Sequence, residues 1–306
     1  VVTAVVVAAG MAVAAAGLPI KWAMTTAVAI SAAAAAAAVL RPAAISMTRS
    51  RSDPSVSTMT TTGDPGAPRS ILLATPSYGD SFCGDFVHGL QNLARWTERS
   101  GIGFNTLFMD YADIVASRNI LTTLFLFEET AYTHLLFIDD DMGFSHTLVA
   151  DALAFDPGLC GAFYPRRRVD MAKLHAGGDK PFETALARAT QFVGEPTPDP
   201  KHHGRFQTAH RIGTGFMLLS RSALQDFINK RPDLIHPSRY DNVVGRSVEK
   251  GWLTLFDRIE ENGFESSEDY AFCARWRDAG GEIWAARDAG LTHMGRMQFS
   301  SRWDKR

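Results

Sequence analysis

The chain is poor in cysteine and has no surplus of charge of either sign. Its three cysteines (Cys83, Cys160 and Cys273) are far apart and show no metal-ligand spacing. An odd number of isolated cysteines gives no support to a disulfide scaffold and favours buried free thiols. Lysine and arginine total 31 against 33 aspartate and glutamate residues, for a formal net charge of -2. The net charge therefore gives no electrostatic reason to expect a nucleic-acid partner.

Residues 1–46 are almost without charge, in contrast to the rest of the chain. Residues 1–20 and 22–40 contain no charged side chain and are rich in alanine. Each is long enough to cross a bilayer, which takes about 20 apolar residues, but alanine is only weakly hydrophobic. Three interpretations stay open: a helical membrane anchor, a targeting segment, or upstream translation outside the real protein, with the start at Met47 or Met59.

Residues 47–68 are rich in Ser, Thr, Pro and Gly, and they predict a flexible linker because they offer little apolar surface to bury. A folded domain is expected over 69–306. Apolar runs predict strands at 71–75, 104–109, 135–138, 159–164, 212–219 and 282–286, and helices at 82–97, 114–129, 148–155, 221–230 and up to 278. Residues 170–209 are polar and predict a long loop or excursion. Strand–helix alternation before residue 139 predicts an α/β fold with a mostly parallel, Rossmann-like sheet flanked by helices.

The most informative feature is an apolar strand, 135–138, that runs directly into Asp139, Asp140 and Asp141. Three adjacent carboxylates repel one another, so a fold that keeps them usually supplies a cation. The carboxyl end of such a strand is also where open α/β sheets bind ligands. If the strand continues, Asp139 and Asp141 point to one side and Asp140 to the other. The alternative is an acidic turn that closes a buried strand.

The order of the motifs over residues 69–296 resembles the GT-A glycosyltransferases, especially the inverting family 2 type and related bacterial and phage enzymes. The motifs that carry the resemblance are Ile71–Tyr78 (first strand and nucleotide loop), Ser117-Arg118-Asn119 (like Ala-Arg-Asn), Asp139-Asp140-Asp141 (like Asp-x-Asp), Glu268-Asp269 (like the Glu-Asp pair) and His293 (like a late metal ligand). Two departures stand out. The second strand ends in Asp110-Tyr111 in place of paired acids, and 170–209 matches no familiar element.

The resemblance implies a role for each of these residues. Contacts to a UDP- or GDP-sugar are implied for Thr75, Pro76, Ser77, Tyr78, Asp110, Arg118, Asn119, Asp139 and Asp140. Asp139, Asp141 and His293 are implied to bind Mn²⁺ or Mg²⁺, which would act as a Lewis acid on the leaving diphosphate. Asp269 is implied to be the catalytic base, with Glu268 beside it.

Several of these residues also have a purely structural interpretation. Asp269 follows two serines and fits the first turn of a helix, where acids favour the helix dipole. Arg118 fits a solvated helix face, and His293 fits a packing role beside the last strand. Arg166–Arg168 follow a strand and either clamp a diphosphate or an anionic acceptor, or form a charged loop.

The resemblance favours a metal-dependent, inverting glycosyltransferase that acts on a glycan or other hydroxyl acceptor. One alternative is a nucleotidyltransferase acting on sugar phosphates, but residues 76–80 lack the glycine-rich basic loop that it would favour. The other is a non-catalytic sugar-binding relative. With a genuine anchor in 1–46 the layout resembles type II membrane enzymes of the Golgi, and without one a cytoplasmic enzyme is expected.

Overall fold

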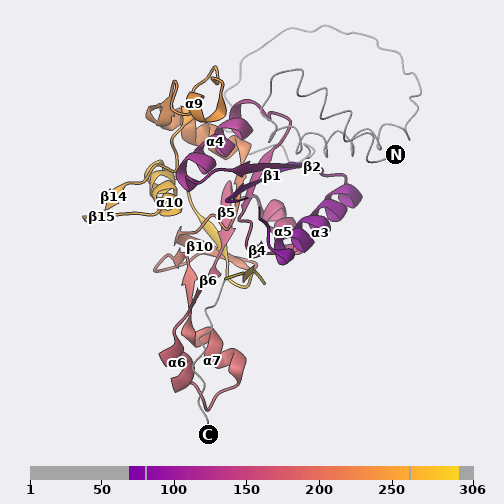
Figure 1. Cartoon of the computed structure of the whole chain (residues 1–306), viewed down its shortest axis with the longest axis vertical. Coiled ribbons are helices and arrows are strands. Elements are labelled where there is room, and N and C mark those ends of the chain that lie inside the picture. Colours follow the sequence, from indigo (N-terminus) through magenta and orange to yellow (C-terminus); the bar gives the residue numbers. More distant parts are fainter. Residues whose placement is uncertain (1–68, 80, 262, 296–306) are drawn as a thin grey trace. The chain divides into compact units, whose positions relative to one another are not determined.

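The computed structural model describes residues 69–79, 81–261 and 263–295 (Figure 1). The predictions for 1–46 and 47–68 lie outside the described residues. Among those residues, none of the helices is both long and apolar enough to cross a membrane.

A nine-stranded sheet organises the described residues, with the order β2-β1-β3-β11-β5-β16-β10-β8 and with β9 also paired to β10. Its strands are β1 (Ser70–Ser77), β2 (Gly103–Asp110), β3 (His134–Ile138), β5 (Leu159–Ala162), β8 (Glu195–Pro196), β9 (His202–His203), β10 (Phe206–Arg211), β11 (Phe216–Ser220) and β16 (Trp284–Ala286). From the pairings, only β10 and β11 run against the other strands. The fold is therefore mixed α/β with a mostly parallel central sheet, as predicted.

The helices are α3 (Gly84–Ser100), α4 (Ile114–Phe127), α5 (His146–Phe155), α6 (Met171–Ala176), α7 (Phe182–Ala189), α8 (Arg221–Lys230), α9 (Asp241–Val244) and α10 (Glu268–Asp278), with a 3-10 turn at Pro232–Leu234. Short strands outside the main sheet are β4 (Met142–Gly143), β6 (Tyr164–Val169), β7 (Thr190–Val193), β12 (Ile235–His236), β13 (Trp252–Leu253), β14 (Glu260–Glu261), β15 (Phe264–Glu265) and β17 (Thr292–His293).

Alternating side chains of the central strands build a core on each face of the sheet. In β3, Leu135 and Phe137 join one buried cluster with residues of α4, α8 and α10. Leu136 and Ile138 join the other cluster with residues of α3 and α5. Figure 1 shows the same division, with α3 and α5 together on one side of the strands and α4 and α10 on the other. Because both faces are covered, residues 135–138 of β3 form an uninterrupted apolar run, as is typical of buried parallel strands.

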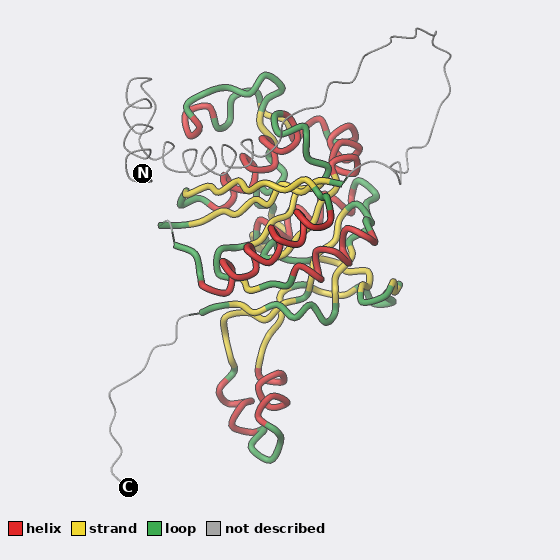
Figure 2. The backbone as a smooth tube through the Cα atoms, turned by 90° about the vertical axis from the view of Figure 1, so that its right-hand side faces the viewer, coloured by secondary structure: helices red, strands yellow, loops and turns green. Residues whose placement is uncertain are grey.

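The segment predicted as a long loop at 170–209 instead contains two helices between paired strands. β6 and β7 pair antiparallel, and α6 and α7 pack on each other at their far end. Both views show this pair of helices projecting from the sheet on the β6–β7 strands (Figures 1 and 2). The helices are short, and α6 buries no residue while α7 buries two alanines. The sequences of α6 and α7 therefore show little apolar periodicity, which explains why the sequence pattern predicts a loop.

Candidate functional site

The acidic run forms a turn at the carboxyl end of β3. The strand ends at Ile138, and the Met142 N–H donates to the Asp139 carbonyl at 3.1 Å. The alternation of the three carboxylates was predicted for a strand that continues past Ile138, and this condition is not met because the chain leaves the extended conformation. Asp139, Asp140 and Asp141 instead line one cavity of about 320 Å³.

We call this the acidic cavity. Its lining consists of Pro76, Ser77, Tyr78, Tyr111, Ala112, Ile114, Arg118, Asp139, Asp140, Asp141, Arg167 and Glu268. Residues that the sequence pattern placed in a nucleotide site thus come together from the ends of β1 and β3 and from the starts of α4 and α10. Tyr111, Ala112 and Ile114 were not predicted; their only signal is that they follow Asp110 at the end of a strand.

Two predicted nucleotide-binding residues, Thr75 and Asp110, do not line the acidic cavity. Thr75 is fully buried inside β1 and does not line the acidic cavity, so its position does not support a ligand contact. Asp110 ends β2 and accepts a hydrogen bond from the Gly79 N–H at 3.0 Å. This bond ties the loop after β1, which includes Tyr78, to the end of β2.

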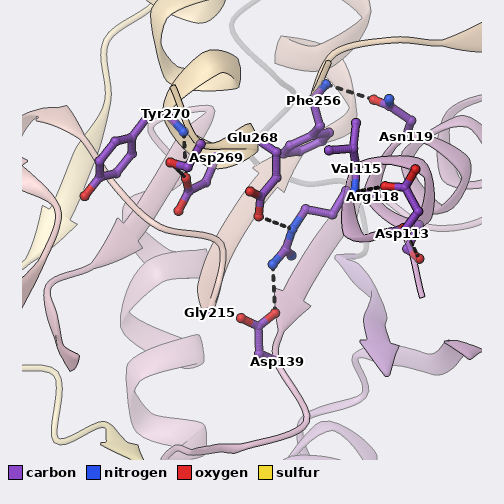
Figure 3. Close-up of polar contacts among 12 residues, drawn as sticks. Asp113, Val115, Arg118, Asn119, Asp139, Gly215, Phe256, Glu268, Asp269 and Tyr270 are labelled. Carbon is purple, nitrogen blue, oxygen red and sulfur yellow. Dashed lines mark hydrogen bonds and ion pairs between the residues drawn. The ribbon is translucent and has the colours of Figure 1, made fainter. Parts of the chain in front are cut away.

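Arg118 is the buried cation of the acidic cavity. Its side chain is 3% exposed and donates to Asp139 Oδ1 at 3.0 Å and to Glu268 Oε1 at 3.4 Å (Figure 3). Burial lowers the pKa of Arg118, but the charges of the neighbouring carboxylates outweigh this and raise it. The third nitrogen, Nη1, is buried without a partner among the described residues. The solvated-face interpretation of Arg118 is therefore wrong.

Asn119 lies on the other side of α4 and has a structural role. Its amide donates to Tyr240 Oη and to Asp257 Oδ1, both at 2.8 Å, and accepts from the Phe256 N–H at 2.8 Å. The side chain is fully buried and does not line the acidic cavity. The predicted contact between Asn119 and a nucleotide is thus not supported, since it would require breaking three buried hydrogen bonds.

A pairing of β17 with β4 brings His293 beside the acidic turn. His293 Nδ1 is 2.8 Å from the Pro165 carbonyl, so Nδ1 carries the proton, and Nε2 lies 3.4 Å from Asp141 Oδ1. Gly143 allows this approach, because a Cβ there would lie 2.2 Å from Thr292 Oγ1. The packing interpretation of His293 is incomplete, since its second nitrogen faces a carboxylate.

Asp141 also accepts a charged hydrogen bond from Arg167 Nη1 at 2.5 Å. Burial raises the pKa of Asp141, but the hydrogen bond and charge of His293, together with Arg167, outweigh it and keep the pKa below its usual value. Desolvation lowers the pKa of His293, but the hydrogen bonds to Asp141 and to the Pro165 carbonyl, together with the charge of Asp141, outweigh it and raise the pKa. Asp141 is thus a carboxylate held ionised by two partners.

The predicted three-residue metal set does not assemble as such. Within 69–79, 81–261 and 263–295, no three His, Cys, Asp or Glu side chains converge tightly enough to hold an ion. Asp139 was predicted as a metal ligand, but its carboxylate is bound by Arg118 instead. Asp141 and His293 do fit a divalent ion: a histidine whose Nδ1 is fixed by a backbone carbonyl and whose Nε2 faces a carboxylate is a typical half-site.

Asp140 indicates an excess of negative charge in the acidic cavity. Burial, followed by the charges of Asp141 and Asp139, raises its pKa to about 6. The Asp140 carboxyl therefore gives up its proton reluctantly, although Arg118 and Arg167 lie in the same cavity. Such an excess fits a site that receives a further cation.

Glu268 and Asp269 begin α10 and face two different cavities. Glu268 lines the acidic cavity, whereas Asp269 lines a second cavity of about 280 Å³. We call this the arginine cavity; its lining is Arg166, Arg167, Val193, Ser267, Asp269, Tyr270 and His293. The two cavities meet at Arg167, which lines both. Of the three arginines Arg166–Arg168, Arg168 lines neither.

Asp269 is fixed by hydrogen bonds in the first turn of α10. The hydroxyl of Ser267 donates to Asp269 Oδ1. The N–H of Tyr270 donates to the same oxygen at 2.8 Å (Figure 3). Burial, and next the charge of Glu268, raise the pKa of Asp269. Oδ2 is not used by these two bonds. The helix-turn and base interpretations are therefore compatible, because one oxygen orients the carboxylate and the other stays available.

Comparisons with known proteins give only distant structural likenesses. No protein-family model matches the chain, and no curated protein matches it. Among solved structures, it is similar to A197 from STIV, at 14% identity over 78% of this chain and 100% of that one, with a TM-score of 0.36. It is also similar to a mutant of β-1,4-galactosyltransferase 7 from Drosophila, whose structure holds manganese, UDP-Gal and xylobiose. That match has 13% identity, 74% and 71% coverage, and a TM-score of 0.38, and scores of this size do not bear on the activity of this chain.

Proposed function

We propose that this chain is a metal-dependent, inverting glycosyltransferase of the GT-A type, which moves a sugar from a nucleotide diphosphate to a hydroxyl acceptor. The observation that carries the proposal is that two adjacent acidic residues, Glu268 and Asp269, line two different cavities. Glu268 faces a cavity rich in carboxylates, and Asp269 faces one that contains no other carboxylate. An inverting transfer needs this division, because the base and the leaving group lie on opposite sides of the reacting sugar carbon.

In this proposal the nucleotide-sugar occupies the acidic cavity. Pro76 and Ser77 at the end of β1, and Tyr78 in the following loop that Asp110 holds, are suited to contact the base and ribose. Nη1 of Arg118, which has no partner within the described part of the chain, supplies a hydrogen-bond donor for a ribose or phosphate oxygen. Asp141 and His293 would hold Mn²⁺ or Mg²⁺, and the ion, when bound, neutralises charge that develops on the diphosphate.

Asp269 is proposed to take the proton of the acceptor hydroxyl. Its raised pKa makes it a stronger base than an ordinary aspartate, while Ser267 and Tyr270 fix its direction. Glu268 contributes by binding Arg118 and by raising the pKa of Asp269. Asp139 keeps Arg118 in place, and Asp140 adds negative charge near the metal-binding half-site.

The experiment is a thermal-shift screen of the full chain against UDP-, GDP- and CMP-sugars, with and without Mn²⁺. A ligand at 100 times its Kd should stabilise the fold by about 2.7 kcal/mol. Asp141→Asn is expected to lose the part of the shift that needs Mn²⁺. Asp269→Asn is expected to keep the full shift and to lose about 10²- to 10⁴-fold in turnover.

The matched control is Asp226→Asn, which changes an exposed aspartate of α8 that lines neither cavity. It should behave as the parent protein in both measurements. Absence of any shift with all three sugar nucleotides would overturn the proposal. Full turnover in Asp269→Asn would remove the base assignment even if donor binding is retained.

A further inference from the structure

The arginine cavity differs from the acidic cavity in the sign of its charge. Its lining includes Arg166 and Arg167 and a single acidic residue, Asp269. The acidic cavity has three aspartates and Glu268 against Arg118 and Arg167. The two cavities are therefore suited to different ligands, although they share one wall.

Arg166 lines the arginine cavity and forms no ion pair among the residues that the structure describes. Arg167 is bound to Asp141, and Arg118 is bound to Asp139 and Glu268. Arg166 is exposed on β6, and none of the ion pairs among the described residues includes it. A guanidinium that lines a cavity without a partner offers a planar set of donors to an anionic group of a ligand.

Tyr270 gives the same cavity a fixed aromatic wall. Its hydroxyl accepts a hydrogen bond from the Gly194 N–H at 3.2 Å, and the guanidinium of Arg211 lies 4.5 Å from the ring centroid. These contacts hold the ring from the β7–β8 turn and from β10. An aromatic side chain with a few placed polar groups is the usual composition of a small-molecule site.

From this arrangement we infer that the acceptor is a hydroxyl compound that carries an anionic group, a carboxylate or a phosphate. Arg166 pairs with the anion, the ring of Tyr270 packs beside the acceptor, and Asp269 faces its hydroxyl. The inference rests on the proposed function for the role of Asp269. The anion selectivity itself is a property of binding and is measured without any sugar nucleotide.

The test is a titration of the full chain, without donor, with methyl β-glucuronide, glucose 6-phosphate and the neutral methyl β-glucoside. At least one anionic sugar is expected to bind about 10-fold or more tightly than the neutral one, and comparison of the two anions distinguishes carboxylate from phosphate. Raised salt should reduce the preference, because Arg166 is exposed and its pairing is screened.

The variant is Arg166→Gln, and the matched control is Arg168→Gln, from the same strand but outside both cavities. Arg166→Gln should abolish the preference for an anion, and Arg168→Gln should retain it. Equal binding of charged and neutral sugars, no binding of any of the three, or equal loss in both variants would overturn the inference. A transferase that passes the donor and Asp269→Asn tests but shows no anion preference would leave the proposed function intact and reject this inference alone.

Discussion

The acidic and arginine cavities share a wall but hold their cations in different ways. Arg118 is 3% exposed, comes from the first turns of α4, and is bound by carboxylates from β3 and α10. Arg167 is 56% exposed and comes from β6, outside the central sheet, where it contacts Asp141. The arginine of the acidic cavity is thus held by buried contacts between elements, while the exposed arginines of the other cavity can move at small cost. The acidic cavity is therefore suited to a charged part of a ligand that does not vary, and the arginine cavity is suited to a part that varies.

The sharpest test of this comparison replaces each arginine by methionine. Arg118→Met leaves Asp139 and Glu268 without their cation, and the free energy of unfolding should fall by about 3 kcal/mol, the low end for a broken buried pair because Asp139 stays 26% exposed. Arg167→Met removes an arginine that is 56% exposed, and Asp141 keeps His293 as a partner, so the loss should be about 0–1 kcal/mol. Urea unfolding of the two variants measures both values. Equal losses would contradict the difference between the cavities.

A second test concerns the support behind the acidic cavity. Asn119→Ala leaves the buried partners of its amide unsatisfied and should reduce the free energy of unfolding by about 1–3 kcal/mol. Below the unfolding temperature the affinity for a sugar nucleotide should stay close to that of the parent, because Asn119 does not line the cavity. Asn229→Ala, an exposed position on α8, is the control and should be near neutral. A large loss of affinity in folded Asn119→Ala would restore the ligand contact predicted from the sequence.

The smallest expected effect lies at the boundary between the cavities. The charge of Glu268 helps to raise the pKa of Asp269, so Glu268→Gln should lower that pKa. A base is active when ionised, and kcat/KM therefore falls as pH drops through its pKa. The acidic limb of the pH profile should move to lower pH in Glu268→Gln. An unmoved limb would mean that burial alone sets the pKa of Asp269.

The sequence was sufficient for the central elements because their residues carry strong local signals. The apolar run at 135–138 and the helical spacing after Ile114 are found where predicted, as β3 and α4. The order of the motifs predicted a shared site for several of these residues. The structure places Asp139, Asp140, Asp141, Arg118 and Glu268 in one cavity. Each of these lies at an end of an element, and the ends of parallel strands meet at one edge of a sheet.

Side-chain partners were beyond the reach of sequence patterns, because they depend on contacts between distant segments. Arg118 meets Glu268 across 150 residues, and Asn119 meets Asp257 across 138. Arg118 and Asn119 are adjacent in α4, yet Arg118 lines the acidic cavity and Asn119 is buried in the core. The β6–β7 arm was missed for another reason: its helices bury almost nothing, so no apolar period marks them.

The pairing of β17 with β4 places His293 at the proposed site without contributing a strand to the central sheet. All nine strands of the central sheet are complete by Ala286, whereas His293 arrives only with the short strand that follows. Shortening the protein to Asp288 would remove Ala289 and Leu291 from the core but would remove no strand of the central sheet. A shortened form of this kind would keep Asp141 and lose His293, and so would test whether the proposed metal site depends on this last strand.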